Sequence, residues 1–486
     1  MTDADVARLR ELGYEQQLER RLGVLDTAAL GFAGISPVVG LYAVVLVGTI
    51  VAGPAWVWVL PVALAGQCLL LAVYGQLAAD FPIAGGAYQW TRRLVGPRYG
   101  WFTGWVAMCA YAVANTTVAY LGAPWALTLA GIEPTANAIV LAGIVLVLIA
   151  AVAGVLGVGV LSRAVQVGIT AEAIASIGIG LTLLLAFREQ DFSLLTGSLG
   201  TGGFLAALAV GGWVFIGFDV AVGAAEETRD AARHVPRAIW MALLGVAALV
   251  VLNAVATALA HPDPAAVAAG EDLDPVTTAV VSSFGSWSDK PFAALVLVAF
   301  LACGMAAQAL TARTMFSIAR DGVLPGARLL RTVDRRRSPI GAIAVTAVVA
   351  CLGLLLGLDS AAVGTLIAFG TAAIYVSFLL IAAAALAARL SGTWQRGGRY
   401  GLALNVASVA WLAFETVNIA WPRESIAPPD APVYQVWAAP LLLGAITVVG
   451  FAYLLIARPR LPETGAERDE HGPDGPVQHA RAAASP

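Results

Sequence analysis

Twelve long apolar segments limit what this chain of 486 residues can fold into. A helix needs about 20 mostly apolar residues to cross the hydrocarbon core of a bilayer. Only 12% of the residues are charged, well below the roughly 25% of a soluble domain. The segments long enough to cross are residues 24–51, 55–79, 99–130, 136–159, 165–187, 203–226, 237–260, 291–319, 340–358, 361–388, 401–421 and 435–456. The sequence therefore predicts an all-α integral membrane protein with twelve transmembrane helices.

Arginine placement predicts how these helices are oriented. With the N-terminus inside, the predicted cytoplasmic segments collect nearly all the basic residues, and the predicted outer loops hold only Arg188, Lys290 and Arg423. Basic residues are enriched in the cytoplasmic loops of membrane proteins. We therefore expect a multi-pass protein of the cell membrane, inner or plasma, with both termini in the cytoplasm.

Three regions are expected along the chain. Residues 1–23 are a cytoplasmic N-terminal segment, residues 24–456 form the transmembrane domain, and residues 457–486 form a polar, disordered cytoplasmic tail. The outer loop of residues 261–290 contains an apolar stretch that is too short to span. There we expect a short helix from Pro275 to Phe284, lying over the outer face.

Two of the predicted spans are interrupted near their middle. The first contains Gly31, Gly34, Ser36, Pro37 and Gly40, and the sixth contains Gly211, Gly212 and Gly217 followed by Asp219. Proline inside a helix removes a hydrogen bond and clashes with the preceding turn. Broken helices at matching positions of two halves are a sequence sign of a transporter site between inverted repeats. The breaks lie five spans apart, which predicts inverted repeats at about 24–187 and 203–388, with helices 11 and 12 at 401–456 added outside them.

Asp219 and Glu172 are the acidic residues that stand out inside predicted spans. An ionisable residue at membrane depth costs about 2.5–3.5 kcal/mol on insertion scales, so it is a functional candidate by default. Asp219 has three interpretations: a proton carrier, a contact for a substrate amine, or a structural residue bonded to amides freed in the first span. Glu172 either pairs with Arg313, takes part in proton coupling, or is a packing residue near the cytoplasm.

Other polar residues in the spans are weaker candidates. The cluster Tyr111, Asn115, Thr116, Thr117 and Tyr120 either lines a pathway or binds helices together. Helical spacing places Gln308 and Thr311 on one face of the eighth span, and Thr371 and Tyr375 on one face of the tenth. With Asn115, these four residues are the supporting candidates around a site. Glu226, Glu227, Arg229 and Arg237 form either an inner gate of salt bridges or a solvated charged rim.

Several function classes find no support in the sequence. It has no Walker loop, no H-E-x-x-H motif and no G-x-S-x-G motif, so no catalytic residues are assigned. The four histidines are scattered over loops and tail, and the four cysteines lie singly in apolar runs, which argues against a metal site. Neither a cofactor nor nucleic-acid binding is expected, and nothing indicates an oligomeric state.

Four sequence blocks carry a resemblance to a known family. They are GISPVVGLY, FPIAGGAYQWTRRLVGPRYGWFTGW, GFDVAVGAAEETRDAARHVPRAI and SIARDGVLPG. Together they resemble the amino acid-polyamine-organocation permeases, and the second and third blocks look most like the amino acid/choline branch, which includes GABA permeases. The resemblance runs from about residue 24 to about residue 456.

This resemblance implies a leucine-transporter type of fold, with substrate bound at the unwound middles of helices 1 and 6. Family members commonly hold a substrate carboxylate on helix 1 amides and an amino group on helix 6 carbonyls. The positions implied here are Gly34, Ile35, Ser36 and Gly40 on helix 1, and Trp213, Phe215, Gly217, Phe218 and Asp219 on helix 6. Either Trp213 or Phe218 is expected to close over the substrate.

The expected function is secondary active transport of an amino acid or related amine, such as GABA, choline or a polyamine, by alternating access. Asp219 and Glu172 are the candidates for coupling to a co-transported proton. Some relatives place a lysine in helix 5 at the position where a sodium ion would sit. Lys290 is the only lysine in this sequence, so helix 5 carries no such lysine. The alternatives are an exchanger, a sensor with the same fold but no transport, and a channel, which would show a continuous polar pore lining.

Overall fold

The computed structural model describes residues 3–197, 199–358, 360–423 and 432–461. Within these ranges the fold is helical, and the one β-bridge joins Leu22 to Thr228. In the described part of the chain, twelve helices are long and apolar enough to cross a membrane, as predicted. The predicted tail lies mostly outside the described residues, which end at 461.

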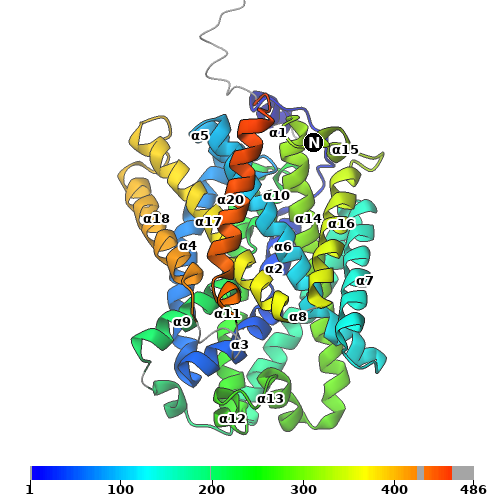
Figure 1. Ribbon diagram of the computed structural model, residues 1–486, viewed down its shortest axis with the longest axis vertical. Helices are drawn as coiled ribbons and strands as arrows, with labels where there is room; N and C mark the ends of the chain where they lie inside the picture. The colour runs from blue at the N-terminus through cyan, green and yellow to red at the C-terminus, as the bar shows by residue number, and fades with distance from the viewer. Residues whose placement is uncertain (1–2, 198, 359, 424–431, 462–486) are drawn as a thin grey trace, which may run out of the picture.

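The spanning helices form one upright bundle (Figure 1). In chain order they are α2 (Val24–Ile35) with α3 (Pro37–Ala52), α4 (Val59–Asp80), α6 (Pro97–Ala130), α7 (Ala136–Val155), α8 (Val158–Ala186), α9 (Thr201–Gly211) with η3 (Gly212–Phe215) and α10 (Asp219–Gly223), α11 (Ala231–Ala260), α14 (Asp289–Arg320), α16 (Ile340–Leu354), α17 (Ser360–Leu390), α18 (Gly398–Ala420) and α20 (Ala438–Ile456).

Short elements precede the spans, connect them or extend their ends. They are α1 (Asp3–Glu11), η1 (Pro54–Trp58), α5 (Gly86–Leu94), η2 (Phe192–Thr196), η4 (Ala225–Glu227), α12 (Pro264–Ala268), α13 (Pro275–Phe284), η5 (Ser286–Ser288), α15 (Ala327–Leu330), η6 (Leu355–Leu358) and α19 (Val433–Val436). The short helix expected in the long loop is α13, with the predicted bounds. Helix α5 was not predicted.

Two helices begin more than one turn earlier than predicted. Helix α8 starts at Val158 rather than 165, and α11 starts at Ala231 rather than 237. Each added turn contains an arginine, and the prediction from apolar length had assigned these arginines to the loops. A helix continues past its apolar stretch when long basic side chains can reach the polar region.

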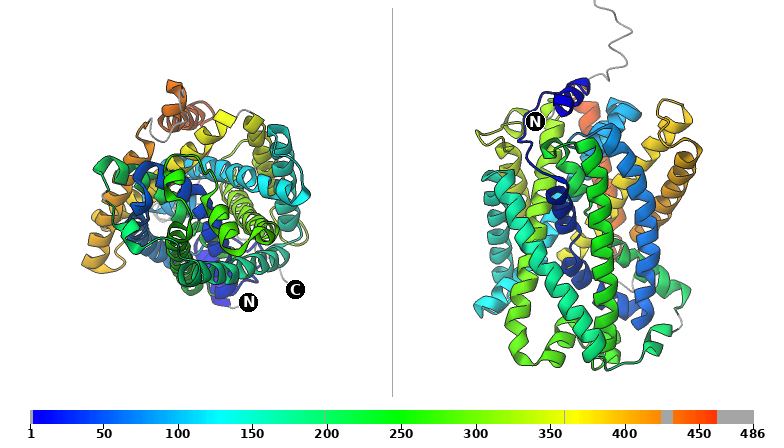
Figure 2. Two further views of the ribbon diagram at one scale, coloured as in Figure 1. Left: turned by 90° about the horizontal axis from the view of Figure 1, so that it is seen from below. Right: turned by 180° about the vertical axis from the view of Figure 1, so that it is seen from behind.

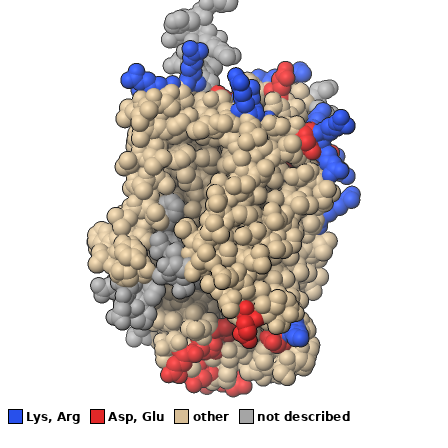
Figure 3. Space-filling model, turned by 45° about the vertical axis from the view of Figure 1, so that its right-hand side comes forward, with Lys and Arg blue, Asp and Glu red and all other residues tan. Residues whose placement is uncertain are grey.

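The two ends of the bundle differ in charge. Helices α1, α5 and α15 lie at the end where the N-terminus is found, here called the N-terminal face, and α12 and α13 lie at the opposite end (Figures 1 and 2). Figure 3 shows Lys and Arg gathered at the N-terminal face and Asp and Glu gathered at the other end. The arginine asymmetry read from the sequence is therefore a property of the folded surface.

Helices 1 and 6 are both broken, as predicted. The first break is at Ser36, with φ 49°, between α2 and α3. The second is at Ile216 and Gly217, with φ 112° at the glycine, between η3 and α10. Five spans separate them, so α2 enters from the N-terminal face and α9 from the opposite face. The breaks meet in the interior, where a Cβ on Gly34 would lie 2.4 Å from the carbonyl oxygen of Gly217.

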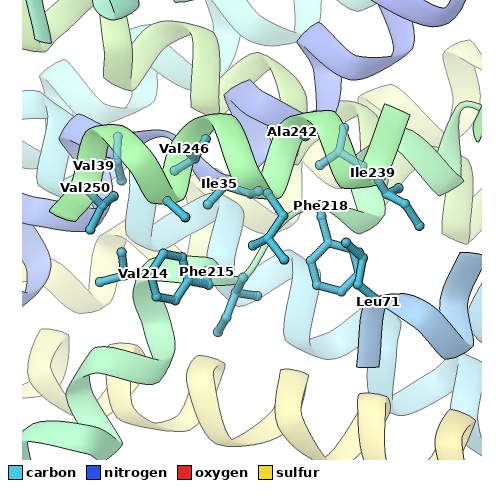
Figure 4. Packing of buried hydrophobic residues seen from close by; sticks show 14 of the residues in the cluster. Ile35, Val39, Leu71, Val214, Phe215, Phe218, Ile239, Ala242, Val246 and Val250 are labelled. Atoms are coloured by element: carbon cyan, nitrogen blue, oxygen red, sulfur yellow. The ribbon is translucent and has the colours of Figure 1, made fainter. Parts of the chain in front are cut away.

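The hydrophobic core surrounds these breaks. Helix α11 supplies a row of aliphatic side chains against both broken helices, and Figure 4 shows this row, including Ile239, Ala242, Val246 and Val250, facing Ile35 and Phe215. On the other side, α14 packs against α6, α2 and α10. The breaks are therefore clamped between two long helices, and their exposed backbone groups are kept from lipid.

Candidate functional site

A small cavity of about 50 Å³ lies where the two breaks meet. Its lining residues are Gly34, Ile35 and Val39 of helix 1, Tyr111, Ala114 and Val118 of α6, Trp213, Ile216, Gly217, Asp219 and Val220 of helix 6, Cys303, Ala307 and Leu310 of α14, and Ile374 of α17. Ligand pockets are usually about 300–1,000 Å³, so this space suits a few water molecules. A substrate would need the walls to move apart.

The break in helix 1 is held by an acid from α8. The Ser36 hydroxyl donates to Oε1 of Glu172 at 2.6 Å, and the Val38 amide donates to the same oxygen at 3.0 Å. Oε2 of Glu172 is buried and has no hydrogen-bond partner among the described residues. The carboxylate therefore lies at the N-terminus of α3, where the helix dipole and free amides favour an anion.

The suggested pairing of Glu172 with Arg313 is wrong. Arg313 lies 2.5 Å from Glu227 instead. Glu172 reaches the freed amides because it sits in the middle of α8 rather than near the N-terminal face, so the interpretation as a cytoplasm-proximal residue is also wrong.

Asp219 opens α10 and faces the cavity. Its Oδ2 accepts a short hydrogen bond from the hydroxyl of Tyr111 on α6, and its Oδ1 is buried without a partner in the described chain. The freed amides of helix 1 go to other acceptors, since Val38 donates to Glu172 and Val39 to the Ser36 hydroxyl. The interpretation of Asp219 as a ligand of those amides is thus not observed.

The aromatic residues of helix 6 point in different directions. Trp213 lines the cavity, whereas Phe215 and Phe218 are fully buried in the core. The ring of Phe218 lies 5.3 Å from that of Tyr74 and 5.6 Å from that of Phe378, and in Figure 4 it points toward Leu71. Phe218 therefore does not cover the cavity in this conformation. Of the three aromatic residues on this segment of helix 6, Trp213 is the one that lines the cavity.

Ser36 and Gly40 support the break rather than line the cavity. The Ser36 side chain turns toward α8 to meet Glu172. A Cβ on Gly40 would lie 3.3 Å from the Val214 side chain, so this glycine allows α3 and η3 to pack closely.

The five supporting candidates are buried and lie outside the cavity lining. Asn115 donates to Gln308 at 2.5 Å, and Gln308 donates to the Ile343 carbonyl at 3.1 Å, which ties α6, α14 and α16 together. The Tyr375 hydroxyl accepts from Gln67 at 2.7 Å and donates to the Gly212 carbonyl at 3.1 Å. The hydroxyl of Thr311 donates to the Ala307 carbonyl of its own helix at 2.8 Å. Thr371 is buried on α17.

Sequence reasoning missed part of the lining. Cys303, Ala307 and Leu310 follow one face of α14, and the thiol of Cys303 lies 3.8 Å from the Gly34 carbonyl oxygen. In the sequence these residues cannot be told from ordinary core residues. Their helical spacing, which places them on one face of α14, is the only signal that connects them. Glu415, another buried acid inside a spanning helix, α18, was also overlooked, and it accepts from Asn418 at 3.2 Å.

Two buried ion pairs close the structure between the cavity and the N-terminal face. Glu226 pairs with Arg320 at 2.8 Å, and Glu227 pairs with Arg313 at 2.5 Å. Burial raises the pKa of Glu227 above its ordinary value, and Arg313 offsets only part of this effect. Each of the four side chains is almost completely buried. The interpretation of the glutamates as a solvated rim is therefore wrong. Arg229 and Arg237 are exposed and take no part in the pairs.

A membrane bundle with two antiparallel broken helices meeting at an internal cavity has the architecture of a secondary transporter. Residues 22–451 match the family model described as amino acid permease, and the chain belongs to this family. The predicted resemblance is therefore confirmed. The relatives are permeases and not enzymes, so the protein is a transporter rather than an enzyme.

Three relatives illustrate the similarity. The amino-acid permease BAT1 homolog of Oryza sativa subsp. japonica is 26% identical, with 94% of each chain covered. The branched-chain amino acid permease BcaP of Bacillus subtilis is 28% identical over 73% of this chain and 80% of its own. The cationic amino acid transporter 3, mitochondrial, of Arabidopsis thaliana is 28% identical over 74% of this chain and 62% of its own.

Proposed function

We propose that this protein transports an amino acid or a closely related amine across the cell membrane by alternating access, coupled to a proton. The observation that carries the proposal is the cavity between the two helix breaks, with the Asp219 carboxylate in its wall. The names of its relatives, which are permeases for amino acids, support the substrate class. The basic N-terminal face would be cytoplasmic under the positive-inside rule.

In this proposal the substrate lies between the breaks. Its amino group faces Asp219, whose Oδ1 is buried and unpartnered among the described residues, and Trp213 closes over it. Its carboxylate approaches the amides at the start of α3. A zwitterion matches this site because one break offers positive helix N-terminal amides and the other a carboxylate.

Glu172 supplies the coupling to the proton. Its carboxylate already accepts the Ser36 hydroxyl and the Val38 amide that a substrate carboxylate would use. Two anions do not share these donors, so substrate binds when Glu172 is protonated. Release of the proton on the other side restores the contact between α8 and α3 and expels the substrate.

The Glu172→Gln variant tests this proposal in proteoliposomes. Glutamine keeps the shape of a protonated carboxyl but carries no exchangeable charge, so uptake should lose its stimulation by an acidic exterior while exchange of substrate for substrate persists. Glu415→Gln is the matched control, because it removes another buried acid, one on α18, and it should respond to the gradient like the wild type. If Glu172→Gln keeps the full gradient response, Glu172 does not carry the proton.

A further inference from the structure

A second, larger hollow lies at the N-terminal face, away from the cavity between the breaks. It has a volume of about 530 Å³ and lies between the N-terminal segment, the α7–α8 turn and the loop before α16. We call it the basic groove, and its lining is Glu19, Arg21, Leu156, Gly157, Gly159, Val160, Arg163, Arg335, Arg336 and Arg337.

The basic groove carries a strong excess of positive charge. Five of its lining residues are arginines, and Glu19 is the one acidic residue among those described in its lining. The Glu19 carboxylate lies 3.9 Å from the Arg21 guanidinium, so it offsets one charge at most. Arg163, Arg335 and Arg337 form no ion pair with any residue that the structure describes. Unpaired guanidiniums gathered around one hollow are suited to binding a phosphate group in bidentate fashion.

The groove is built by the backbone as well as by side chains. Oδ1 of Asp334 accepts from the amides of Arg336 and Ser338, which commits this nearby acid to shaping the loop. The Arg336 guanidinium donates to the Leu156 carbonyl at 3.4 Å and joins the loop to the α7–α8 turn. The N-terminus of α8, which spans 29 residues, opens here after Gly157 without a side-chain cap. Its free amides add to the attraction for an anion.

The position of the groove indicates that the anion is attached to a lipid. Leu156 and Val160 in its wall are 42% and 45% exposed, and Val152 and Val155 on the preceding turn of α7 are exposed as well. Exposed aliphatic residues on spanning helices face the hydrocarbon core, so the arginines lie at the level of the headgroups. Basic pockets between transmembrane helices on the cytoplasmic side suit anionic headgroups.

We propose that the basic groove binds the phosphate-bearing headgroup of an anionic phospholipid, with the acyl chains lying along Leu156 and Val160. This site is separate from the substrate site and does not depend on the proposed function.

Native mass spectrometry of the detergent-purified protein tests the proposal. The probes are phosphatidylglycerol, phosphatidylcholine and inorganic phosphate, each added at the same concentrations. The groove variant is Arg335→Gln/Arg336→Gln/Arg337→Gln. The matched control is Arg98→Gln/Arg237→Gln/Arg460→Gln, which removes three exposed arginines that lie outside the groove lining.

The wild type should retain phosphatidylglycerol and hold phosphatidylcholine much more weakly. Each lost arginine should weaken phosphatidylglycerol binding about fivefold, so the groove variant should lose on the order of a hundredfold, while the control changes by less than about threefold. Equal losses in both triple variants, or equal binding of phosphatidylcholine, would overturn the proposal. So would inorganic phosphate that competes as well as the lipid, since the site would then recognise the free anion. If the triple variant does not fold, Arg163→Gln is used in the same assay and should lose about fivefold.

Discussion

Among single residues, two glycines allow the helix breaks to approach each other closely. A Cβ on Gly34 would lie 2.4 Å from the Gly217 carbonyl oxygen, and a Cβ on Gly217 would lie 2.2 Å from the Gly34 carbonyl oxygen. Gly217 also has φ 112°, a conformation that L-residues with side chains rarely adopt. These two positions therefore permit the breaks to touch, and no larger residue fits without moving the backbone.

Replacing Gly217 by alanine should separate the breaks. Overpacking of this kind costs roughly 1–3 kcal/mol or more, so we expect a lower melting temperature and the loss of most substrate uptake. Gly202→Ala is the control, because a Cβ there meets nothing within 4 Å. A Gly217→Ala protein with wild-type melting temperature and uptake would show that the contact is not needed.

The carboxylate of Asp219 is expected to contribute to substrate affinity. If its carboxylate holds the substrate amine, Asp219→Asn should raise the KM for uptake about 10- to 100-fold, since a hydrogen bond to a charged group contributes roughly 1.5–3 kcal/mol. Tyr111→Phe removes the observed donor to Oδ2 but leaves the charge, so its KM should change less. An unchanged KM in a folded Asp219→Asn protein would remove Asp219 from the substrate contact.

The sequence indicated some of these residues and missed others for a definite reason. Of the positions predicted to bind substrate, five line the cavity: Gly34, Ile35, Trp213, Gly217 and Asp219. The direction of a side chain near a break depends on the local backbone, and the 3₁₀ turn of η3 places Phe215 in the core while Trp213 faces the cavity. No periodicity of the sequence reports that turn.

At the scale of elements, the N-terminal segment acts as a strap across the N-terminal face. The Tyr14 hydroxyl donates to both carboxylate oxygens of Asp321, at 2.8 and 2.9 Å, at the end of α14. The Arg320 guanidinium lies 3.8 Å from the centre of the Tyr14 ring, and the Gln16 side chain donates to the Glu226 carbonyl at 3.0 Å. The strap therefore joins α14 to the end of helix 6 next to the buried ion pairs.

This strap should loosen in alkali. Burial and the Asp321 carboxylate raise the pKa of Tyr14 above its ordinary value, against the opposing effect of Arg92 and Arg320. A raised pKa means that the folded state favours the neutral phenol. The stability that neutral Tyr14 gives to the folded state is therefore complete below the ordinary tyrosine pKa of about 10. It is lost as the pH rises through the pKa that Tyr14 has in the folded state.

Hydrogen–deuterium exchange of α1 and α5 measures this effect. Exchange in wild-type protein, corrected for the intrinsic rate, should increase as the pH rises above about 10, and Tyr14→Ala should exchange fast at neutral pH. Tyr400→Ala, which changes an exposed tyrosine on α18, is the control. Equal protection of α1 in Tyr14→Ala and wild type would mean that the strap is held by other contacts.

The spans were predictable because length and hydropathy alone define them, whereas α5 was not. Its sequence, GAYQWTRRL, is short and polar, and its helix is stabilised by packing against α6 and α17. The buried ion pairs were hidden for a similar reason. Glu226 and Glu227 adjoin exposed arginines in the sequence, but the fold gives them Arg320 and Arg313 from α14. Contacts between distant spans do not leave a local pattern.

At the scale of the whole molecule, the structure is closed toward the N-terminal face. The ion pairs Glu226–Arg320 and Glu227–Arg313 and the strap lie between the cavity and that face. Breaking one partner of a buried pair costs about 3–5 kcal/mol, because the other charge stays buried. Separating only one charge from its partner without hydrating both would carry this cost, so opening toward this face requires each pair to part with its charges becoming hydrated.

In the proposed function, the cavity between the helix breaks binds an amino acid, and the protein carries it across the membrane. Uptake of a labelled panel of amino acids and amines into proteoliposomes, with and without an imposed proton or sodium gradient, tests this most directly. Wild-type protein should accumulate at least one panel member, faster with an acidic exterior, and Gly217→Ala should not. Folded wild-type protein that binds a panel member but shows neither uptake nor exchange would contradict transport and indicate a sensor.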